Sequence, residues 1–271
     1  ADFGMDSVAI TDHGTMFGAM TFYEKAKRAG IKPIIGCECY LAPGRLTEKT
    51  PLDKRGLSHL ILLAENQEGY RNLCKLATIA QFKGFYYKPR IDKALLRKYS
   101  KGLIGVSASL RAEVNEAYKL GDTDRAIALA HEYSDILGPN NFFLEIQDHG
   151  IADQKTANIN LFKVAEITGL PVVATNDVHY VRQEHAEAHD VLICLQRGDL
   201  VADPARHRYE GEQYYMKSGE EMAALFPDRG QQAVRIFGMV MQIADQRVSD
   251  CPVFRQGEIN FFIYTYIFFI T

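Results

Sequence analysis

The sequence predicts an α/β fold built from parallel βα units. Short apolar segments alternate along most of the chain with segments whose apolar residues recur at helical spacing. The predicted strands are apolar at successive positions, which is typical of parallel strands buried on both faces. Periodicity alone leaves open whether the sheet is open or closed into a barrel.

Six segments are predicted as strands. Each is short, apolar and bounded by turn residues or by a helical pattern. They are residues 7–11, 33–36, 59–64, 103–107, 142–146 and 171–175.

Helices are expected between these strands. The first begins near Thr15 and carries apolar residues at helical spacing as far as Tyr23. Asn66 is suited to cap the N-terminus of a second helix, because its side chain can accept a hydrogen bond from the first helical turn. Asp122 precedes a third predicted helix. Residues 153–169 form another predicted helix.

The chain divides into three predicted parts. Residues 1–209 form the α/β domain, and residues 210–247 a small helical extension that opens with the capping-box pattern at Ser218. Residues 248–271 form an atypical tail that ends in an uncharged aromatic run. We expect this run to promote aggregation more readily than to join the fold, because it lacks polar–apolar alternation.

Composition excludes several classes of protein. The net charge is −3, with 31 basic and 34 acidic residues, so the chain lacks the strong positive charge of a dedicated DNA-binding domain. Its five cysteines form no CxxC pair, which favours a reducing compartment. No apolar run is long enough to span a membrane. These features predict a cytoplasmic protein.

Polar side chains follow several predicted strands, where ligands bind in parallel α/β folds. His13 follows the first strand, Glu38 the second, and the pair Asp177 and His179 the sixth. Imidazole together with carboxylate suits zinc, manganese or iron better than calcium. The same rule selects His149, which is either a residue without a role in the site or an outer-shell residue.

Other candidates are weaker. His59 lies at the start of its predicted strand, so the rule does not select it. Cys37 and Cys39 flank Glu38 and should face the opposite side, into the core. Four further histidines are expected to be solvated or structural: His131, His185, His189 and His207.

Four long motifs carry a family resemblance: AITDHGTMFGAMTFYEKAKRAGIKPIIGCECYLA, HLILLAENQEGYRNLCKLAT, GFYYKPRID and PVVATNDVHYVRQEHAEAHDVLICLQRG. In this order they resemble the PHP domain of bacterial DNA polymerase III alpha subunits, from about residue 1 to residue 244. The resemblance implies a distorted (β/α)7 barrel with metal ions at one mouth. It also implies that the barrel's first strand, with an H-x-H pair, lies upstream of Ala1 and is missing here.

The resemblance implies a metal-ligand set. Its members are His13, Glu38, His59, Asp177 and His179, and Asp12 matches a common neighbour of the site. Together with His149, selected above, Asp12 and Ser109 are the three outer-shell candidates. Ser109 stands where the family usually has a ligating cysteine or histidine, and a serine hydroxyl is a poorer ligand. A divalent metal (zinc, manganese or magnesium) is therefore expected to bind weakly to this chain.

The implied function is the amino-terminal part of a replicative DNA-directed DNA polymerase, a nucleotidyltransferase. Its metal site would be related to 3′–5′ exonuclease and phosphoesterase chemistry. The chain alone should be inactive, because it has no polymerase palm. The alternatives are a stand-alone PHP phosphoesterase, disfavoured by GFYYKPRID and HDVLICLQRG, and a purely structural or docking module.

The implied partners are primer-template DNA, deoxynucleotides, a proofreading exonuclease subunit and a sliding clamp. Lys83, Lys88 and Arg90 surround three aromatic residues at 85–87, and such a basic-aromatic loop could contact a phosphate backbone. The alternative for this segment is an ordinary exposed loop.

Overall fold

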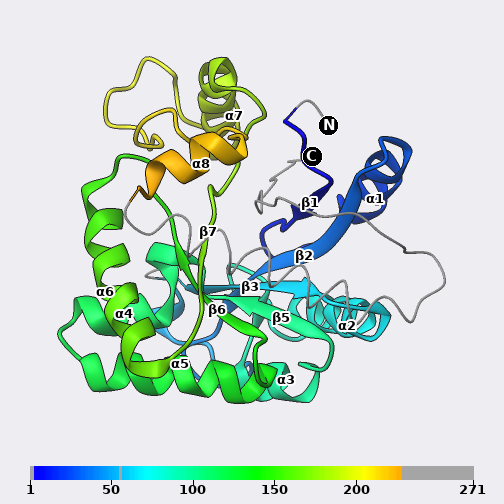
Figure 1. Cartoon of the computed structure of the whole chain (residues 1–271), viewed down its shortest axis with the longest axis vertical. Coiled ribbons are helices and arrows are strands. Elements are labelled where there is room, and N and C mark those ends of the chain that lie inside the picture. The colour runs from blue at the N-terminus through cyan, green and yellow to red at the C-terminus, as the bar shows by residue number, and fades with distance from the viewer. Residues whose placement is uncertain (1–2, 55–56, 228–271) are drawn as a thin grey trace.

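The computed structural model describes residues 3–54 and 57–227 (Figure 1). Two predictions lie outside these residues: the second helix of the extension, and the aromatic tail. The described part has one curled sheet surrounded by helices, which confirms the predicted α/β class. No helix among the described residues is long and apolar enough to cross a membrane.

All six predicted strands are present, and a seventh, two-residue strand joins them. The sheet order is β1-β2-β3-β5-β6-β7, and β4 pairs with β2. The strands are β1 (Ser7–Ile10), β2 (Lys32–Leu41), β3 (Ser58–Ala64), β4 (Arg90–Ile91), β5 (Leu103–Val106), β6 (Phe142–Ile146) and β7 (Val172–Ala174). The sheet curls into a half-barrel whose two ends in this order are β1 and β7.

The prediction of uniformly parallel strands is wrong. β3 runs antiparallel to both of its neighbours, β2 and β5, whereas the β1–β2, β5–β6 and β6–β7 pairs are parallel. The segment between β2 and β3 contains prolines, and its described residues form the short 3-10 helix Pro51–Lys54 but no α-helix. Without a crossover helix, the chain returns alongside β2 in the opposite direction.

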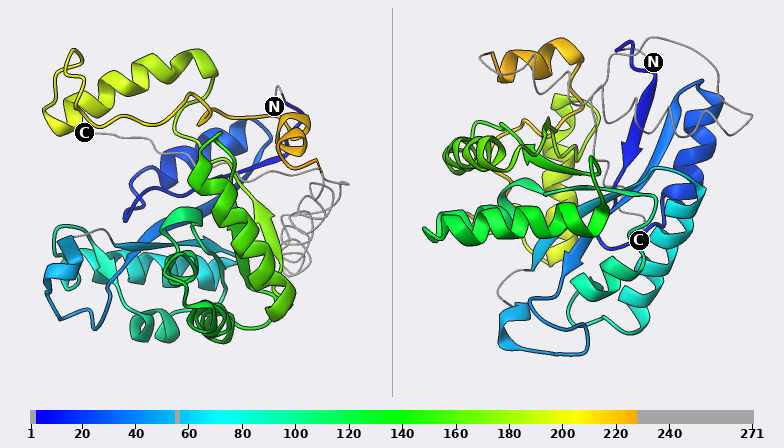
Figure 2. Two further views of the ribbon diagram at one scale, coloured as in Figure 1. Left: turned by 90° about the vertical axis from the view of Figure 1, so that its left-hand side faces the viewer. Right: turned by 60° about the horizontal axis from the view of Figure 1, so that its bottom comes forward.

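Eight α-helices lie in the described part: α1 (Ala19–Arg28), α2 (Gln67–Phe82), α3 (Lys93–Lys98), α4 (Glu113–Lys119), α5 (Thr123–Leu137), α6 (Ala152–Thr168), α7 (Ala186–Arg197) and α8 (Gly219–Leu225). Figure 2 shows that helices cover the outside of the curled sheet, while α7 and α8 lie beyond β7.

The predicted caps at Asn66 and Ser218 are confirmed. Asn66 accepts a hydrogen bond from Gly69 N at 3.0 Å, and Ser218 forms a capping box. In addition, Asp122 caps α5 by accepting a hydrogen bond from Arg125 N at 3.0 Å. The predicted start of α1 is wrong, because Asp12 Oδ2 accepts a hydrogen bond from the N-cap residue Gly18, and the helix begins at Ala19.

The face predicted for the start of α1 is not buried either. Phe17, Met20 and Tyr23 are all exposed to solvent in the described part. Helical spacing alone thus identified an apolar face but not its burial.

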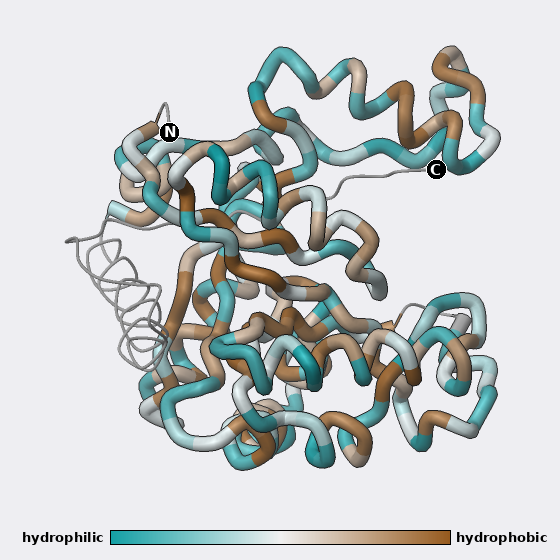
Figure 3. Tube along the Cα trace, turned by 90° about the vertical axis from the view of Figure 1, so that its right-hand side faces the viewer, coloured by the Kyte–Doolittle hydropathy of each residue, from teal (hydrophilic) through white to brown (hydrophobic). Residues whose placement is uncertain are grey.

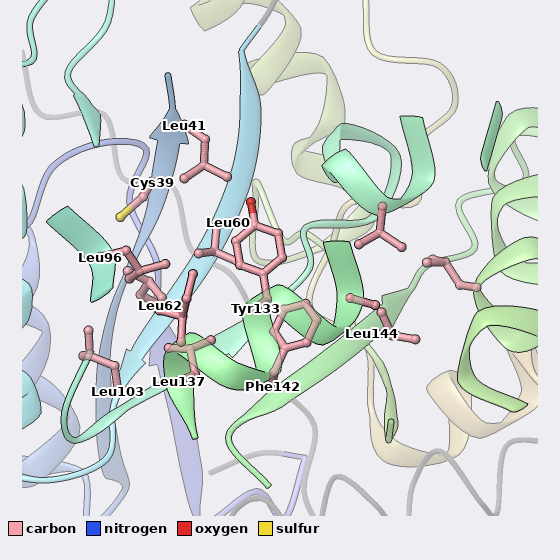
Figure 4. Close-up of a cluster of buried hydrophobic side chains, with 14 of the residues drawn as sticks. Cys39, Leu41, Leu60, Leu62, Leu96, Leu103, Tyr133, Leu137, Phe142 and Leu144 are labelled. Carbon is pink, nitrogen blue, oxygen red and sulfur yellow. The ribbon is translucent and has the colours of Figure 1, made fainter. Parts of the chain in front are cut away.

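The two faces of the sheet have separate apolar clusters. The outer face packs against the helices, with Leu60, Leu62 and Phe142 among its residues (Figure 4). The inner face holds a smaller cluster that includes Ile61, Val106 and Phe143. Burial of each such side chain contributes roughly 1.5–3 kcal/mol. Figure 3 shows the apolar strands at the centre of the molecule and more polar segments around them.

Candidate metal centre

The inner face of the half-barrel changes from apolar to polar toward one end. Side chains alternate along a strand, so every second residue faces inward. In β6 the inward-facing residues are Phe143 and Glu145, and Gln147 continues this series directly after the strand. Glu145 and Gln147 line a cavity of about 410 Å³. His13, beyond β1, and Glu38, in β2, line the same cavity.

Backbone pairing beyond the end of β1 holds His13 beside Glu38. Glu38 N donates to Asp12 O at 3.0 Å, and Gly14 N donates to Glu38 O at 2.9 Å. Gly14 has φ +63°, and a Cβ there would lie 2.6 Å from Pro89 Cγ. Glycine is therefore required for the chain to turn directly after His13.

His13, Glu38 and His59 form the tightest group of metal-capable side chains in the described part, with one ligand atom from each within 4.8 Å of the others. Glu38 Oε2 lies 3.2 Å from His13 Nδ1, and Glu38 Oε1 lies 2.5 Å from His59 Nδ1. Burial alone would raise the pKa of Glu38, but the neighbouring charge on His13 and the hydrogen bond and charge of His59 outweigh it and lower the pKa to about 2.

The antiparallel direction of β3 explains why the strand-exit rule overlooked His59. Tyr40 near the end of β2 is paired with His59 near the start of β3. The start of an antiparallel strand lies at the same sheet edge as the end of its neighbour. His59 therefore reaches the cavity from the opposite chain direction.

Asp177 and His179 line the cavity but do not belong to the tight group. Asp177 has φ +41°, so the segment is not the extended D-x-H that the sequence predicted. His179 Nδ1 lies 2.6 Å from the Asp177 carbonyl oxygen, and its Nε2 lies 2.8 Å from Tyr209 Oη. The histidine thus donates from Nδ1 to the carbonyl and accepts at Nε2 from the phenol.

The three outer-shell candidates lie in different surroundings. Asp12 is buried and supports the start of α1. His149 is buried, stacks on Tyr214 with ring centroids 4.0 Å apart, and lies 3.0 Å through Nε2 from the Asn176 carbonyl oxygen. Burial lowers the pKa of His149. Ser109 is the first residue of a short 3-10 helix, Ser109–Arg111. The other two residues of this helix, Leu110 and Arg111, line the cavity.

The basic-aromatic loop divides into exposed and buried residues. Lys83 and Lys88 are exposed, and Lys88 Nζ lies 5.5 Å from the centre of the Tyr40 ring, which is in edge contact with His59. Arg90 is completely buried. Neither of the two alternatives, a DNA contact or an exposed loop, describes Arg90, because its guanidinium binds Asp53 and the carbonyl oxygen of Gly84.

Sequence reasoning missed several residues of the cavity wall. Glu145 is fully buried, and its pKa is raised to about 8 by burial and by the charges on Asp177 and Glu38. A glutamate inside an otherwise apolar strand was the available signal for it. Tyr209 and the exposed His207 also line the cavity, but their polar segment gave no such signal.

The geometry fits a divalent cation. Two imidazoles converge on one ionised carboxylate, which is a donor set suited to zinc or manganese. The three residues come from three neighbouring segments of the sheet edge, so the fold brings them together.

Comparison with known proteins identifies the family. Residues 1–149 match the PHP domain model. The chain belongs to the PHP domain family. Its curated relatives include DNA polymerase III subunit alpha of Saccharopolyspora erythraea, 41% identical over 80% of this chain and 20% of the relative.

Other relatives have the same name. The subunit of Borreliella burgdorferi is 44% identical over 83% of this chain and 20% of its own length, and that of Thermus aquaticus is 42% identical over 93% and 22%. The chain therefore spans about a fifth of the length of these relatives. One solved structure, a protein of Bifidobacterium adolescentis proposed to be a metal-dependent phosphoesterase, aligns with 65% of this chain and 78% of its own. Its TM-score of 0.37 and its 14% sequence identity are too low to support an argument about fold or function.

Proposed function

We propose that this chain is the PHP part of a replicative DNA polymerase III alpha subunit and that its cavity binds a divalent metal ion. The observation that carries the proposal is the 38–44% identity to alpha subunits across at least four-fifths of the chain. DNA replication in the cytoplasm is the process in which such a protein acts. Primer-template DNA, deoxynucleotides, a proofreading exonuclease subunit and a sliding clamp are its proposed partners.

The proposed metal site comprises His13, Glu38 and His59, with Asp177 and His179 on the adjoining wall. A divalent cation held there would polarise a phosphoester and activate water. The low pKa of Glu38 keeps its carboxylate charged at neutral pH, so no proton has to leave it before a cation binds. The Asp177 carbonyl oxygen accepts a hydrogen bond from His179 Nδ1 and so orients the ring. His179 Nε2, which now accepts a hydrogen bond from Tyr209, is the nitrogen that could bind a cation instead.

We propose that the exposed part of the loop before β4 contacts single-stranded DNA. Phe85 and Tyr87 are exposed beside Lys83 and Lys88, a combination suited to base stacking and phosphate binding. Lys88 lies over the Tyr40 ring, next to His59, so a strand held on this loop would pass close to the cavity.

Two assays on the purified chain separate the proposal from a stand-alone phosphoesterase. With manganese or zinc present, we expect neither primer extension nor appreciable hydrolysis of p-nitrophenyl phosphate or of 3′-labelled single-stranded DNA. Turnover of the phosphomonoester that is lost in Glu38→Gln would favour the stand-alone enzyme. Primer extension by the chain itself would contradict the proposed division of activities.

Metal binding tests the site directly. Calorimetric titration with Mn²⁺ should show binding that Glu38→Gln abolishes. A matched control is Glu68→Gln, because Glu68 is an exposed glutamate of α2 that does not line the cavity. Equal binding by the Glu38 variant and the wild-type protein would contradict the proposed site.

A further inference from the structure

Glu145 is a charged residue in an unusual place. It lies within β6, is fully buried, and faces the cavity between Phe143 and Gln147. Its backbone N–H donates to Ser107 Oγ at 2.9 Å, so the neighbouring segment after β5 fixes the backbone at this position.

Only one of its two carboxyl oxygens is satisfied in the described part of the chain. Oε1 accepts a hydrogen bond from Thr175 Oγ1 at 2.8 Å. Oε2 is buried and has no hydrogen-bond partner there. A buried carboxyl oxygen without a donor is costly, so such an atom usually has a partner in the working protein.

The supports of Glu145 indicate that it is held in place. Thr175 Oγ1 also accepts from Gln147 Nε2 at 3.2 Å, and Gln154 Nε2 donates to Gln147 Oε1 at 3.3 Å. Such a network fixes the carboxyl group and leaves one oxygen for a further interaction. Glu38, Asp177 and Glu210 line the same cavity, so other acidic side chains there would also attract a cation.

We infer that Glu145 Oε2 binds a divalent cation in this cavity, on the β6 side of the tight group of His13, Glu38 and His59, to which Glu145 itself does not belong. The inference rests on the proposed metal site and adds an oxygen ligand to it. An additional carboxylate ligand shifts the preference of a site toward manganese or magnesium, compared with a site made of imidazoles alone. Glu145 is then a ligand that neither the strand-exit rule nor the family motifs indicated.

Calorimetric titration of the whole chain with Mn²⁺ alone tests the inference. Glu145→Gln keeps the size and shape of the side chain and removes its charge, and we expect Mn²⁺ to bind at least tenfold more weakly. Glu68→Gln is the matched control, because Glu68 is an exposed glutamate of α2 that does not line the cavity, and it should bind within about twofold of wild type. If Glu145→Gln binds Mn²⁺ as tightly as the wild-type protein, the inference is overturned. If Glu38→Gln also binds Mn²⁺ as tightly as the wild-type protein, the proposed metal site itself is wrong.

A second measurement separates a ligand from a residue with a structural role. Water-proton relaxation by bound Mn²⁺ reports how many water molecules the ion holds. A lost carboxylate ligand is replaced by water, so relaxivity per bound ion should rise in Glu145→Gln at saturating metal. Unchanged relaxivity with weaker binding would mean that Glu145 acts indirectly, which also overturns the inference. If Glu145→Gln fails to fold by circular dichroism, Glu145→Asp, which keeps the charge but withdraws the oxygen, serves for both measurements with the same expected directions.

Discussion

Replacing Arg90 by alanine should lower the free energy of unfolding by about 3–5 kcal/mol, because it leaves a buried carboxylate without its cation. Arg90 is fully buried and forms an ion pair with Asp53, whose side chain is also buried. Burial raises the pKa of Asp53, but hydrogen bonds from Thr50 and the pairing with Arg90 outweigh it and lower the pKa.

The same guanidinium satisfies three backbone carbonyl groups. It donates to the oxygen of Gly84 at 2.9 Å, of Glu48 at 3.1 Å and of Leu46 at 3.2 Å. Arg90 thus holds the loop after β2 against the loop before β4. Each carbonyl that loses a buried donor adds on the order of 1 kcal/mol, although these contributions are not independent.

Urea denaturation followed by far-ultraviolet circular dichroism measures the effect, since the chain has no tryptophan. Lys88→Ala is the matched control: it is an exposed cation of the same loop and should change stability by no more than about 0.5 kcal/mol. Asp53→Ala combined with Arg90→Ala should be less destabilising than the sum of the single variants, because the pair is removed together.

Single-stranded DNA binding distinguishes the structural role of Arg90 from the DNA contact that the sequence suggested. A loss of stability below about 1 kcal/mol in Arg90→Ala, together with weaker DNA binding, would refute the structural role. We expect the reverse pattern in Lys88→Ala, with stability retained and DNA binding weakened in a salt-dependent way.

Three further predictions concern the cavity. Glu38→Gln should lower Mn²⁺ affinity at least ~100-fold by calorimetry, because it removes the carboxylate that both histidines face; unchanged affinity would contradict the site. Gly14→Ala should cost about 2 kcal/mol or more in urea denaturation, because of its positive φ and the contact with Pro89, and a neutral effect would mean that the turn beside His13 adapts. In metal-free protein, the pKa of Glu145 is raised from its ordinary 4.5 to about 8 in the folded state. The protonated carboxyl group is therefore compatible with the fold below pH 4.5, and the free energy of unfolding decreases as the pH rises from 4.5 through 8. At about 1.4 kcal/mol per unit, Glu145→Gln should flatten the pH dependence of stability in this range by several kcal/mol, and superimposable pH profiles would show that the carboxyl group is not buried.

The local signals in the sequence were sufficient for six of the seven strands of the described part, for most of the helix caps and for part of the site. Caps at Asn66, Asp122 and Ser218 depend on a side chain and a backbone N–H a few residues away, so the sequence contains the whole interaction. His13 was selected by its place after a strand. Glu38 was selected by the same rule, but the predicted end of its strand is wrong, because β2 continues through Glu38 to Leu41. The cysteines at 37 and 39 were correctly expected in the core, because alternation follows from strand geometry.

Strand direction, burial and side-chain pairing were decided only by the tertiary structure. His59 reaches the cavity because β3 runs antiparallel to β2, and no local pattern states the direction of a strand. Arg90 looked like a surface cation because its neighbours are basic and aromatic, but its buried partner Asp53 is 37 residues away. Glu145 became visible only when the inner face of the half-barrel placed it in the cavity with one oxygen unsatisfied. The physical reason is the same in each case: these properties depend on contacts between segments distant in sequence, whereas the sequence by itself determined the helices, strands and turns that bring those segments together.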